Sequence, residues 1–250
     1  MSSTVKHPMS TSFALVPKKD INDWRSTGDY RHLNAKPVPD RYPLPHIHDL
    51  TATLKGTIVF SKIGLVKAYN QIPLATDDIP KTAIITPFGL YEFSRMPFGL
   101  RKAAENFQRF IDEVFRDLNF IHVYVDDCLV ASPDRESNLQ HLYIVFERLK
   151  KHGITVNIQK FQIGTDSLDF LGHTIEAQGI RPLRGKVAVI LDYPEPTTIK
   201  QFLTLNGLVS FYGRFIPKCA SLMKPLADQR RANAKSINLD DTVRKALSTV

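Results

Sequence analysis

Two adjacent carboxylates, Asp126 and Asp127, follow Tyr124 and Val125 in the apolar stretch FIHVYVDDCLVAS. Apolar residues on both sides predict two strands joined at an acidic turn, with both acids at the tip of the hairpin. Neighbouring carboxylates repel each other unless a cation compensates for their charge, and Mg²⁺ prefers oxygen ligands of this kind. Because Asp is also common in ordinary turns, the pair alone leaves a plain surface turn open.

Phosphoryl transfer with two metal ions needs more than this pair. Both ions, about 3.5–4 Å apart, must flank the reacting phosphate, so a third acid from another strand is expected. The stretch TIVFSKI, from Thr57 to Ile63, is rich in β-branched and aromatic residues and predicts a strand. Gly64 follows at its end, where the chain is expected to turn toward LVKAY.

Two helices are predicted around the acidic turn. The segment AAENFQRFIDEVFRDL, residues 103–118, has the apolar spacing of an amphipathic helix, with a stripe of Phe107, Phe110, Ile111, Val114, Phe115 and Leu118. A second helix is expected from Glu136 to His152, ending at Gly153. Its apolar face would consist of Leu139, Leu142, Phe146 and Leu149.

Further elements are predicted on either side of this region. The four prolines of PVPDRYPLP require an extended connector, and a subdomain boundary is expected near it. LDFLGHTI is expected to form one strand. The segment IKQFLTLNGLVSFYGRFI predicts a helix that is capped by Thr197 or Thr198 and ends before Pro217.

Composition restricts the class of protein. The chain has 250 residues, of which 43% are apolar, so it can bury a sizeable core. It contains no apolar run of the roughly 18 residues that a membrane span needs, and MSSTVKHPMSTS lacks the apolar core of a signal peptide. We therefore expect a cytoplasmic or nuclear protein. Its net charge of +8 suits a polyanionic partner such as nucleic acid, whereas its two distant cysteines support neither a disulfide framework nor a zinc site.

A series of motifs follows one another along the chain: VPKKDINDWRSTGDYRHLN, DRYPLPHIHDL, FSKIGLVKAYNQI, IPKTAIITPFGLYEF, MPFGLRKAAENFQRFIDEV, YVDD, LDFLGHTI, GIRP and FYGRFIP. In this order they resemble the reverse transcriptase domain of a gypsy-type LTR retrotransposon Pol polyprotein. The resemblance implies an α+β right-hand polymerase fold, in which helices back an antiparallel palm sheet. A domain of this family copies an RNA or DNA template from a primer, using Mg²⁺ and deoxynucleoside triphosphates.

The resemblance also implies a division of the chain. Fingers that lack their outer part would comprise residues 1–44 and 72–101, and the palm residues 45–71 and 102–180. The thumb would comprise residues 181–227, and residues 228–250 would begin a tether toward an absent RNase H domain.

For the catalytic site, the resemblance makes Asp126 and Asp127 the metal-binding aspartates. The backbone carbonyl of Leu65 would be a further metal ligand. Gly64 stands where the family has its first catalytic aspartate. Loss of a residue that only supports a metal ligand already lowers affinity or activity by about 10–100-fold, and loss of a direct ligand should lower it further. The sequence therefore predicts weakened Mg²⁺ binding and little or no polymerase activity.

The resemblance supplies two further groups of residues. The nucleotide-binding group is Lys18, Arg25, Tyr69, Phe98, Gly99 and Lys160. The template-primer group is Arg31, Asn34, Tyr124, Leu171, Gly172 and His173. By residue type alone, a core aromatic residue is the favoured interpretation of Tyr69, and solvated surface charge that of Lys18 and Arg25.

Three hypotheses follow for the function. The chain is a working RNA-directed DNA polymerase, a non-catalytic nucleic-acid-binding remnant of a mobile element, or a fragment that does not fold on its own. Primer extension would support the first, salt-dependent binding of a template-primer duplex without extension the second, and a noncooperative thermal melt the third.

Overall fold

The computed structural model describes residues 11–17, 24–35, 42–49, 54–194, 196–221 and 224. The chain forms two compact units, Met1–Leu168 and Asp169–Val250, and each has a hydrophobic core of its own. Within the described residues, every helix is too short or too polar to cross a membrane.

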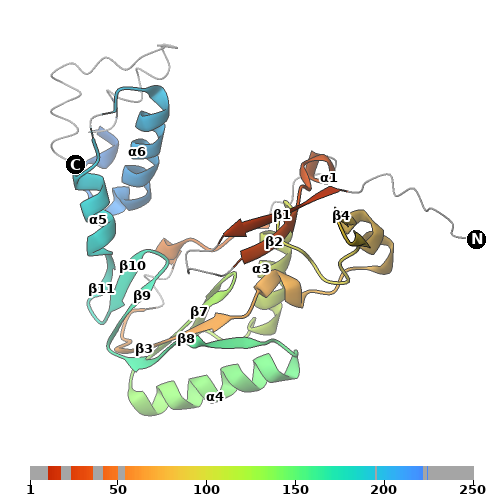
Figure 1. The fold of residues 1–250 in the computed structure, drawn as a ribbon. Coiled ribbons are helices and arrows are strands. Elements are labelled where there is room, and N and C mark those ends of the chain that lie inside the picture. Colours follow the sequence, from red (N-terminus) through yellow and green to blue (C-terminus); the bar gives the residue numbers. More distant parts are fainter. Residues whose placement is uncertain are drawn as a thin grey trace, which may run out of the picture. The chain divides into compact units, whose positions relative to one another are not determined.

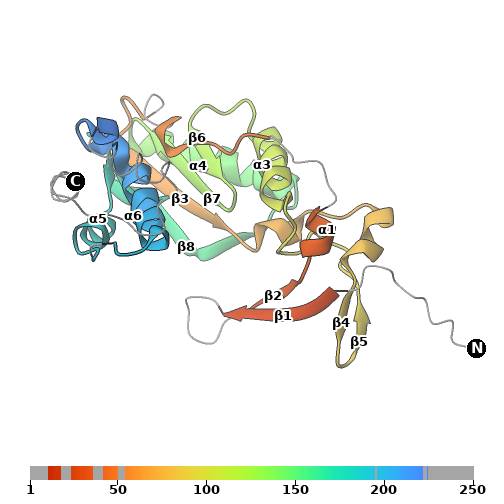
Figure 2. The same cartoon turned by 90° about the horizontal axis from the view of Figure 1, so that it is seen from above.

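The first unit is built on a four-stranded sheet with the order β6-β7-β3-β8, in which every neighbouring pair is antiparallel. Figure 1 labels β7, β3 and β8, and Figure 2 labels all four strands. We call it the central sheet. Its strands are β3 (Val59–Leu65), β6 (Ile121–Tyr124), β7 (Asp127–Ser132) and β8 (Val156–Thr165). The expected strand over TIVFSKI is confirmed, but it does not end before Gly64. Because Gly64 pairs with Asp127 on one side and Asn157 on the other, the hydrogen-bonded ladder continues past it to Leu65.

Two helices pack on the central sheet and share one buried apolar cluster with it. They are α3 (Ala103–Val114) and α4 (Arg135–Lys151). Both predicted helices are therefore confirmed, although α3 ends one turn earlier than expected. Asp134 caps α4 by accepting a hydrogen bond of 2.7 Å from the backbone N–H of Ser137. The prediction for Leu139 was wrong: this side chain is 67% exposed, because Asn138 takes the inward position in the first turn.

Asn138 is the centre of a buried polar network that joins α4 to the central sheet. Its Nδ2 donates to the hydroxyl of Ser132 at 3.1 Å, and its Oδ1 accepts from the hydroxyl of Ser61 at 2.8 Å. The Ser61 hydroxyl also accepts from the backbone N–H of Gly164 at 2.9 Å. These buried polar groups are mutually satisfied, so the network fixes how the helix sits on three strands.

A second sheet of the first unit has the order β2-β1-β4-β5 (Figure 2). Its strands are β1 (Thr11–Pro17), β2 (Trp24–Gly28), β4 (Ile84–Thr86) and β5 (Gly89–Tyr91). The short helical turns of this unit are α1 (Arg31–Ala35), η1 (Ile47–Asp49), η2 (Ala68–Gln71) and η3 (Thr76–Thr82). Strands β1 and β4 pair in parallel, and the buried Tyr30 hydroxyl ties this sheet to η3 by donating to the carbonyl of Thr82 at 3.1 Å.

The second unit begins within a three-stranded sheet and continues into two helices. Its elements are β9 (Ser167–Phe170), β10 (His173–Glu176), β11 (Gly179–Pro182), α5 (Arg184–Leu191), α6 (Ile199–Tyr212) and η4 (Gly213–Phe215). The single strand expected over LDFLGHTI was wrong: Leu171 and Gly172 have positive φ angles of 48° and 81°, which reverse the chain between β9 and β10. The predicted cap is confirmed, since Thr198 and Gln201 form a capping box at the start of α6.

Candidate active site

The acidic turn joins β6 to β7 at the end of the central sheet, as the sequence predicts. Tyr124 and Asp127 face each other across the hairpin, and Val125 and Asp126 form the turn between them. Val125 has a φ of 52°, which is rare for a β-branched residue because its side chain crowds the backbone there. The turn must therefore be held in place by its surroundings.

Gln108 on α3 holds this turn. It is fully buried, and its Oε1 accepts a hydrogen bond of 2.9 Å from the backbone N–H of Val125. Its Nε2 donates to the carbonyl of Val123 at 2.9 Å and to Asp112 Oδ1 at 2.8 Å. Gln108 was not among the site residues predicted from the sequence. The available signal was a polar residue next to Phe107 on the apolar stripe of a strongly amphipathic helix.

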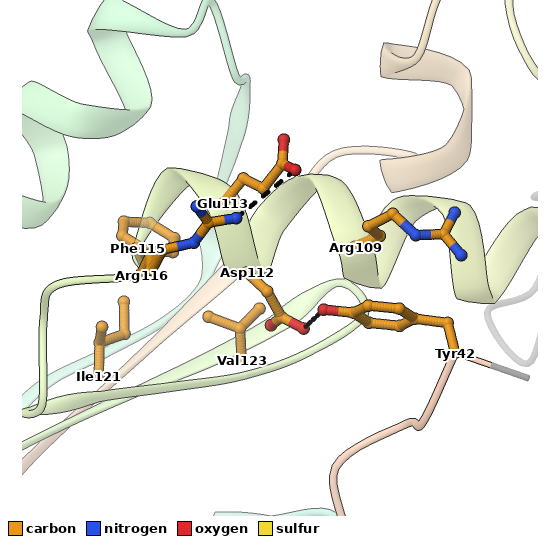
Figure 3. A pocket seen from close by; sticks show the side chains of 8 residues that line it. All are labelled: Tyr42, Arg109, Asp112, Glu113, Phe115, Arg116, Ile121 and Val123. Carbon is orange, nitrogen blue, oxygen red and sulfur yellow. Dashed lines mark hydrogen bonds and ion pairs between the residues drawn. The ribbon is translucent and has the colours of Figure 1, made fainter.

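The same chain of hydrogen bonds leads to a cavity of about 560 Å³ at α3 and β6 (Figure 3). The Tyr42 hydroxyl donates to Asp112 Oδ2 at 2.7 Å, and the guanidinium group of Arg109 lies 4.8 Å from the centre of the Tyr42 ring. The hydrogen bond to Asp112 raises the pKa of Tyr42. The acidic turn is thus connected through Gln108 and Asp112 to Tyr42, a residue far away in the sequence.

Each of the two carboxylates lies near a lysine. Lys160 Nζ is 3.2 Å from Asp126 Oδ2, and Lys62 Nζ is 4.0 Å from Asp127 Oδ2. Burial raises the pKa of Asp127; the positive charge of Lys62 opposes this effect, and the neighbouring charge of Asp126 adds to it. A backbone hydrogen bond also joins β3 to the turn, since the N–H of Leu65 donates to the main-chain carbonyl of Asp126 at 2.8 Å.

Gly64 lies directly opposite Asp127 in the ladder between β3 and β7. This is the position from which a residue of β3 could share a metal ion with the turn. The space above Gly64 is filled, because a Cβ atom added there would lie 2.5 Å from Lys160 Cδ and 2.7 Å from Lys160 Cβ. The structure thus brings together six of the predicted site residues: Gly64, Leu65, Tyr124, Asp126, Asp127 and Lys160.

A second group of predicted residues gathers around η2 and the loop before α3. The ring of Tyr69 packs edge-on against Phe98 at 5.3 Å and Phe107 at 6.3 Å between centroids. Asn34 clamps the neighbouring loop: its Nδ2 donates to the carbonyl of Gly99, and its Oδ1 accepts from the backbone N–H of Arg101, each at 2.8 Å. Asn34, expected at the template, therefore supports the loop expected over the nucleotide.

The remaining predicted residues that the structure describes make other contacts. Arg31 forms an ion pair with Asp29, which lowers the pKa of that carboxyl to about 2, and the Arg31 side chain is 90% exposed. Arg25 belongs to β2, and Lys18 lies outside the described residues. In the second unit, His173 is buried against the rings of Phe211, Tyr212 and Phe215, and the Tyr212 hydroxyl donates to the carbonyl of Gly172 at 3.0 Å.

The residues at the turn do not fit a site for two divalent ions. Among the described residues, no three His, Cys, Asp or Glu side chains are close enough together to hold a metal ion. The side chains at the turn that could coordinate a metal ion are two carboxylates, and each has a lysine beside it. Two bridging ions would need a further acid on β3, where the chain has Gly64.

Known proteins are similar to this chain in sequence and in fold. The family model described as reverse transcriptase (RNA-dependent DNA polymerase) matches residues 16–175. The Pol polyproteins of transposons opus and gypsy from Drosophila melanogaster are 36% and 34% identical over 94% and 93% of this chain. The Tf2-3 polyprotein of Schizosaccharomyces pombe is 32% identical over 85%. The chain spans 25%, 23% and 16% of the length of these three relatives.

Solved structures of similar fold come from foamy virus. The protease-reverse transcriptase in complex with dsDNA matches with a TM-score of 0.84 and 24% identity, covering 96% of this chain and 51% of that one. The same protein in complex with an RNA/DNA hybrid matches with a TM-score of 0.79 and 25% identity, covering 96% and 33%. The α+β right-hand fold expected from the sequence is confirmed by these similarities.

Proposed function

The chain belongs to the reverse transcriptase (RNA-dependent DNA polymerase) family, and on this premise we propose that it binds a template-primer duplex but has lost most or all nucleotidyl transfer. Reverse transcriptases are generally metal-dependent, so the residues at the acidic turn decide whether this chain retains the reaction. The division into fingers, palm and thumb given above stays a prediction.

One observation carries the proposed loss of catalysis. Gly64 pairs with Asp127 across the ladder, in the position from which a third carboxylate would complete the site, and Lys160 fills the space that such a side chain would need. A two-metal reaction requires ligands that hold both ions against their mutual repulsion. Asp126 and Asp127 alone are not expected to do so.

Duplex binding is supported by other features. The solved relatives are complexes with dsDNA and with an RNA/DNA hybrid, and this chain carries a net charge of +8. Binding to phosphates by Lys and Arg does not need the missing carboxylate. The loop at Gly99 and the packed pair of Tyr69 and Phe98 also support a nucleotide-binding surface of the kind that the resemblance implies, and their contacts do not depend on the acid missing at position 64.

The test compares binding and extension by one preparation of the protein. Fluorescence anisotropy with a labelled oligo(dT) primer on poly(A) should show binding that weakens steeply between about 50 and 200 mM salt. Primer extension with Mg²⁺ and deoxythymidine triphosphate should remain at background level. Extension well above background would overturn the proposed loss of catalysis, and failure to bind the duplex at low salt would overturn the proposed binding.

A retained polymerase activity is the second candidate function. The observation in its favour is the intact hairpin, in which Asp126 and Asp127 stand at the turn after Tyr124. If these two carboxylates suffice, then Asp127→Asn should abolish extension. If the activity is already absent, Asp127→Asn should leave duplex binding equal or slightly tighter, because it removes one negative charge.

A further inference from the structure

We propose that Lys160 takes the place of a metal ion at the acidic turn: its side chain fills the space above Gly64, and its ammonium group neutralises Asp126. The proposal rests on the loss of nucleotidyl transfer proposed above, and it names the residue that maintains this state. It predicts that an acid at position 64 is not enough to rebuild the metal site.

The first step is steric. The three atoms nearest to a Cβ built on Gly64 are Cδ, Cβ and Cγ of Lys160, at 2.5, 2.7 and 3.2 Å. Gly64 is not among the glycines with positive φ, so its backbone would accept an L-residue. The side chain of Lys160, rather than backbone strain, therefore excludes a larger residue at this position.

A register shift between β3 and β8 brings Lys160 to Gly64. Strand β3 pairs with β8 at Lys62 opposite Gln162 and at Gly64 opposite Asn157, so the register shifts between these two pairs. Four residues of β8, 158–161, lie opposite the single residue Ile63. Such a bulge bends the strand and redirects its side chains. Lys160 belongs to this bulge, which turns its side chain across Gly64 toward the acidic turn.

The third step is electrostatic. The ammonium group of Lys160 lies 3.2 Å from Asp126, and that of Lys62 lies 4.0 Å from Asp127, so two lysines face two carboxylates. The side chains of Lys160 and Asp126 are each 45% exposed, and water weakens their attraction. A divalent ion could approach Asp126 only by displacing the ammonium group or by binding beside it.

The steric step is tested by thermal unfolding of paired variants. Gly64→Ala should lower the midpoint by about 3 °C or more in the natural chain, because the added Cβ would overlap with Cβ and Cδ of Lys160. In a Lys160→Gly background the same substitution should leave the midpoint unchanged or raise it, since alanine orders a strand better than glycine. Equal changes in both backgrounds would show that Lys160 does not exclude a side chain at position 64.

The electrostatic step is tested by measuring the affinity for manganese alone. Calorimetry or the electron paramagnetic resonance signal of the free ion measures this affinity. Lys160→Met keeps much of the side-chain volume but removes the charge, and should tighten manganese binding by about twofold to fivefold. The matched control is Lys150→Met, an exposed lysine of α4, which should leave it unchanged. Equal affinity of the natural chain and Lys160→Met would overturn the proposal.

Restoration of the site needs both changes. Gly64→Asp combined with Lys160→Gly should bind manganese at least tenfold more tightly than either single variant, as expected when a direct ligand is regained. Gly64→Asp alone binding as tightly as the double variant would refute the role of Lys160. These readouts are separate from the proposed function: primer extension by the natural chain would overturn that proposal, whereas the inference about Lys160 stands or falls on unfolding and on manganese binding.

Discussion

Lys160 and Gly64 occupy complementary space: a Cβ on Gly64 would lie 2.7 Å from Lys160 Cβ, closer than two such atoms approach in folded proteins. The absence of a side chain at one position is therefore matched by the presence of a long one at the other. Because the Lys160 ammonium group also contacts Asp126, the same lysine fills the gap and compensates the charge. An aspartate introduced at position 64 would therefore encounter both the steric overlap with Lys160 and the positive charge of its ammonium group.

The turn that carries the carboxylates depends on Gln108, and this gives the first prediction. Gln108→Leu should lower the free energy of unfolding by about 2 kcal/mol or more, because the buried N–H of Val125 and the carbonyl of Val123 lose hydrogen bonds. Urea unfolding followed by circular dichroism measures this change. The control Gln140→Leu, on the exposed side of α4, should change stability by less than about 0.5 kcal/mol. Similar values for both variants would show that the turn does not need Gln108.

Much of this site could be predicted from local patterns in the sequence. The acidic hairpin and α3 follow from apolar residues at spacings of two and of three to four, and these spacings are visible within about fifteen residues. Resemblance to a family identified Gly64 as the missing acid. The resemblance placed Lys160 at the site, but its position over Gly64 could not be predicted, because it depends on a register shift between β3 and β8, which are almost a hundred residues apart.

Two structural predictions from the sequence were wrong, one for a strand and one for a buried side chain. LDFLGHTI has apolar residues at both ends and no proline, as one strand would, but Leu171 and Gly172 have φ angles of 48° and 81° and mark the reversal between β9 and β10. On α4, apolar type placed Leu139 in the core, whereas the buried residue of that turn is Asn138. An amide can occupy the core there because Ser61 and Ser132 satisfy it, and these partners come from distant strands.

The second prediction concerns this buried amide. Asn138→Ala should destabilise the chain by about 2–3 kcal/mol, since the hydroxyl groups of Ser61 and Ser132 would each lose a partner inside the protein. The midpoint of urea unfolding gives the value. Asn119→Ala is the matched control, because Asn119 is exposed in the connection before β6. A loss below about 0.5 kcal/mol for Asn138→Ala would mean that water replaces the network.

The third prediction is a pH dependence that comes from His122 on β6. Burial lowers the pKa of His122 from 6.5 to about 4, so the folded chain disfavours its protonation. The unfolded chain binds more protons between these values, and stability is therefore complete above about pH 6.5 and falls as the pH drops toward 4. At pH 5 the loss from this group should be at most about 2 kcal/mol relative to pH 7.5.

The comparison of two variants isolates this contribution. His122→Phe should unfold in urea with a smaller difference between pH 7.5 and pH 5 than the natural chain shows. His32→Gln, a substitution at an exposed histidine, should keep the full difference. Asp127 acts in the opposite direction, since its raised pKa favours the folded state on acidification, but it is present in all three proteins and cancels. An unchanged pH difference in His122→Phe would assign the effect to other groups.

The fourth prediction decides what Asn34 does. Its side-chain amide forms hydrogen bonds with both the carbonyl of Gly99 and the N–H of Arg101, so it stabilises the loop before α3. Asn34→Ala should therefore speed hydrogen exchange at the Arg101 amide by about tenfold, the effect of losing roughly 1.4 kcal/mol of local stability. Amides of α4 should keep their protection. The family resemblance instead places Asn34 at the template. If Asn34 contacts the template directly, Asn34→Ala would weaken duplex binding while leaving hydrogen exchange at Arg101 unchanged. Measuring both quantities on the same variant separates the two roles, because support of the loop acts on the free protein, whereas a template contact exists only in the complex.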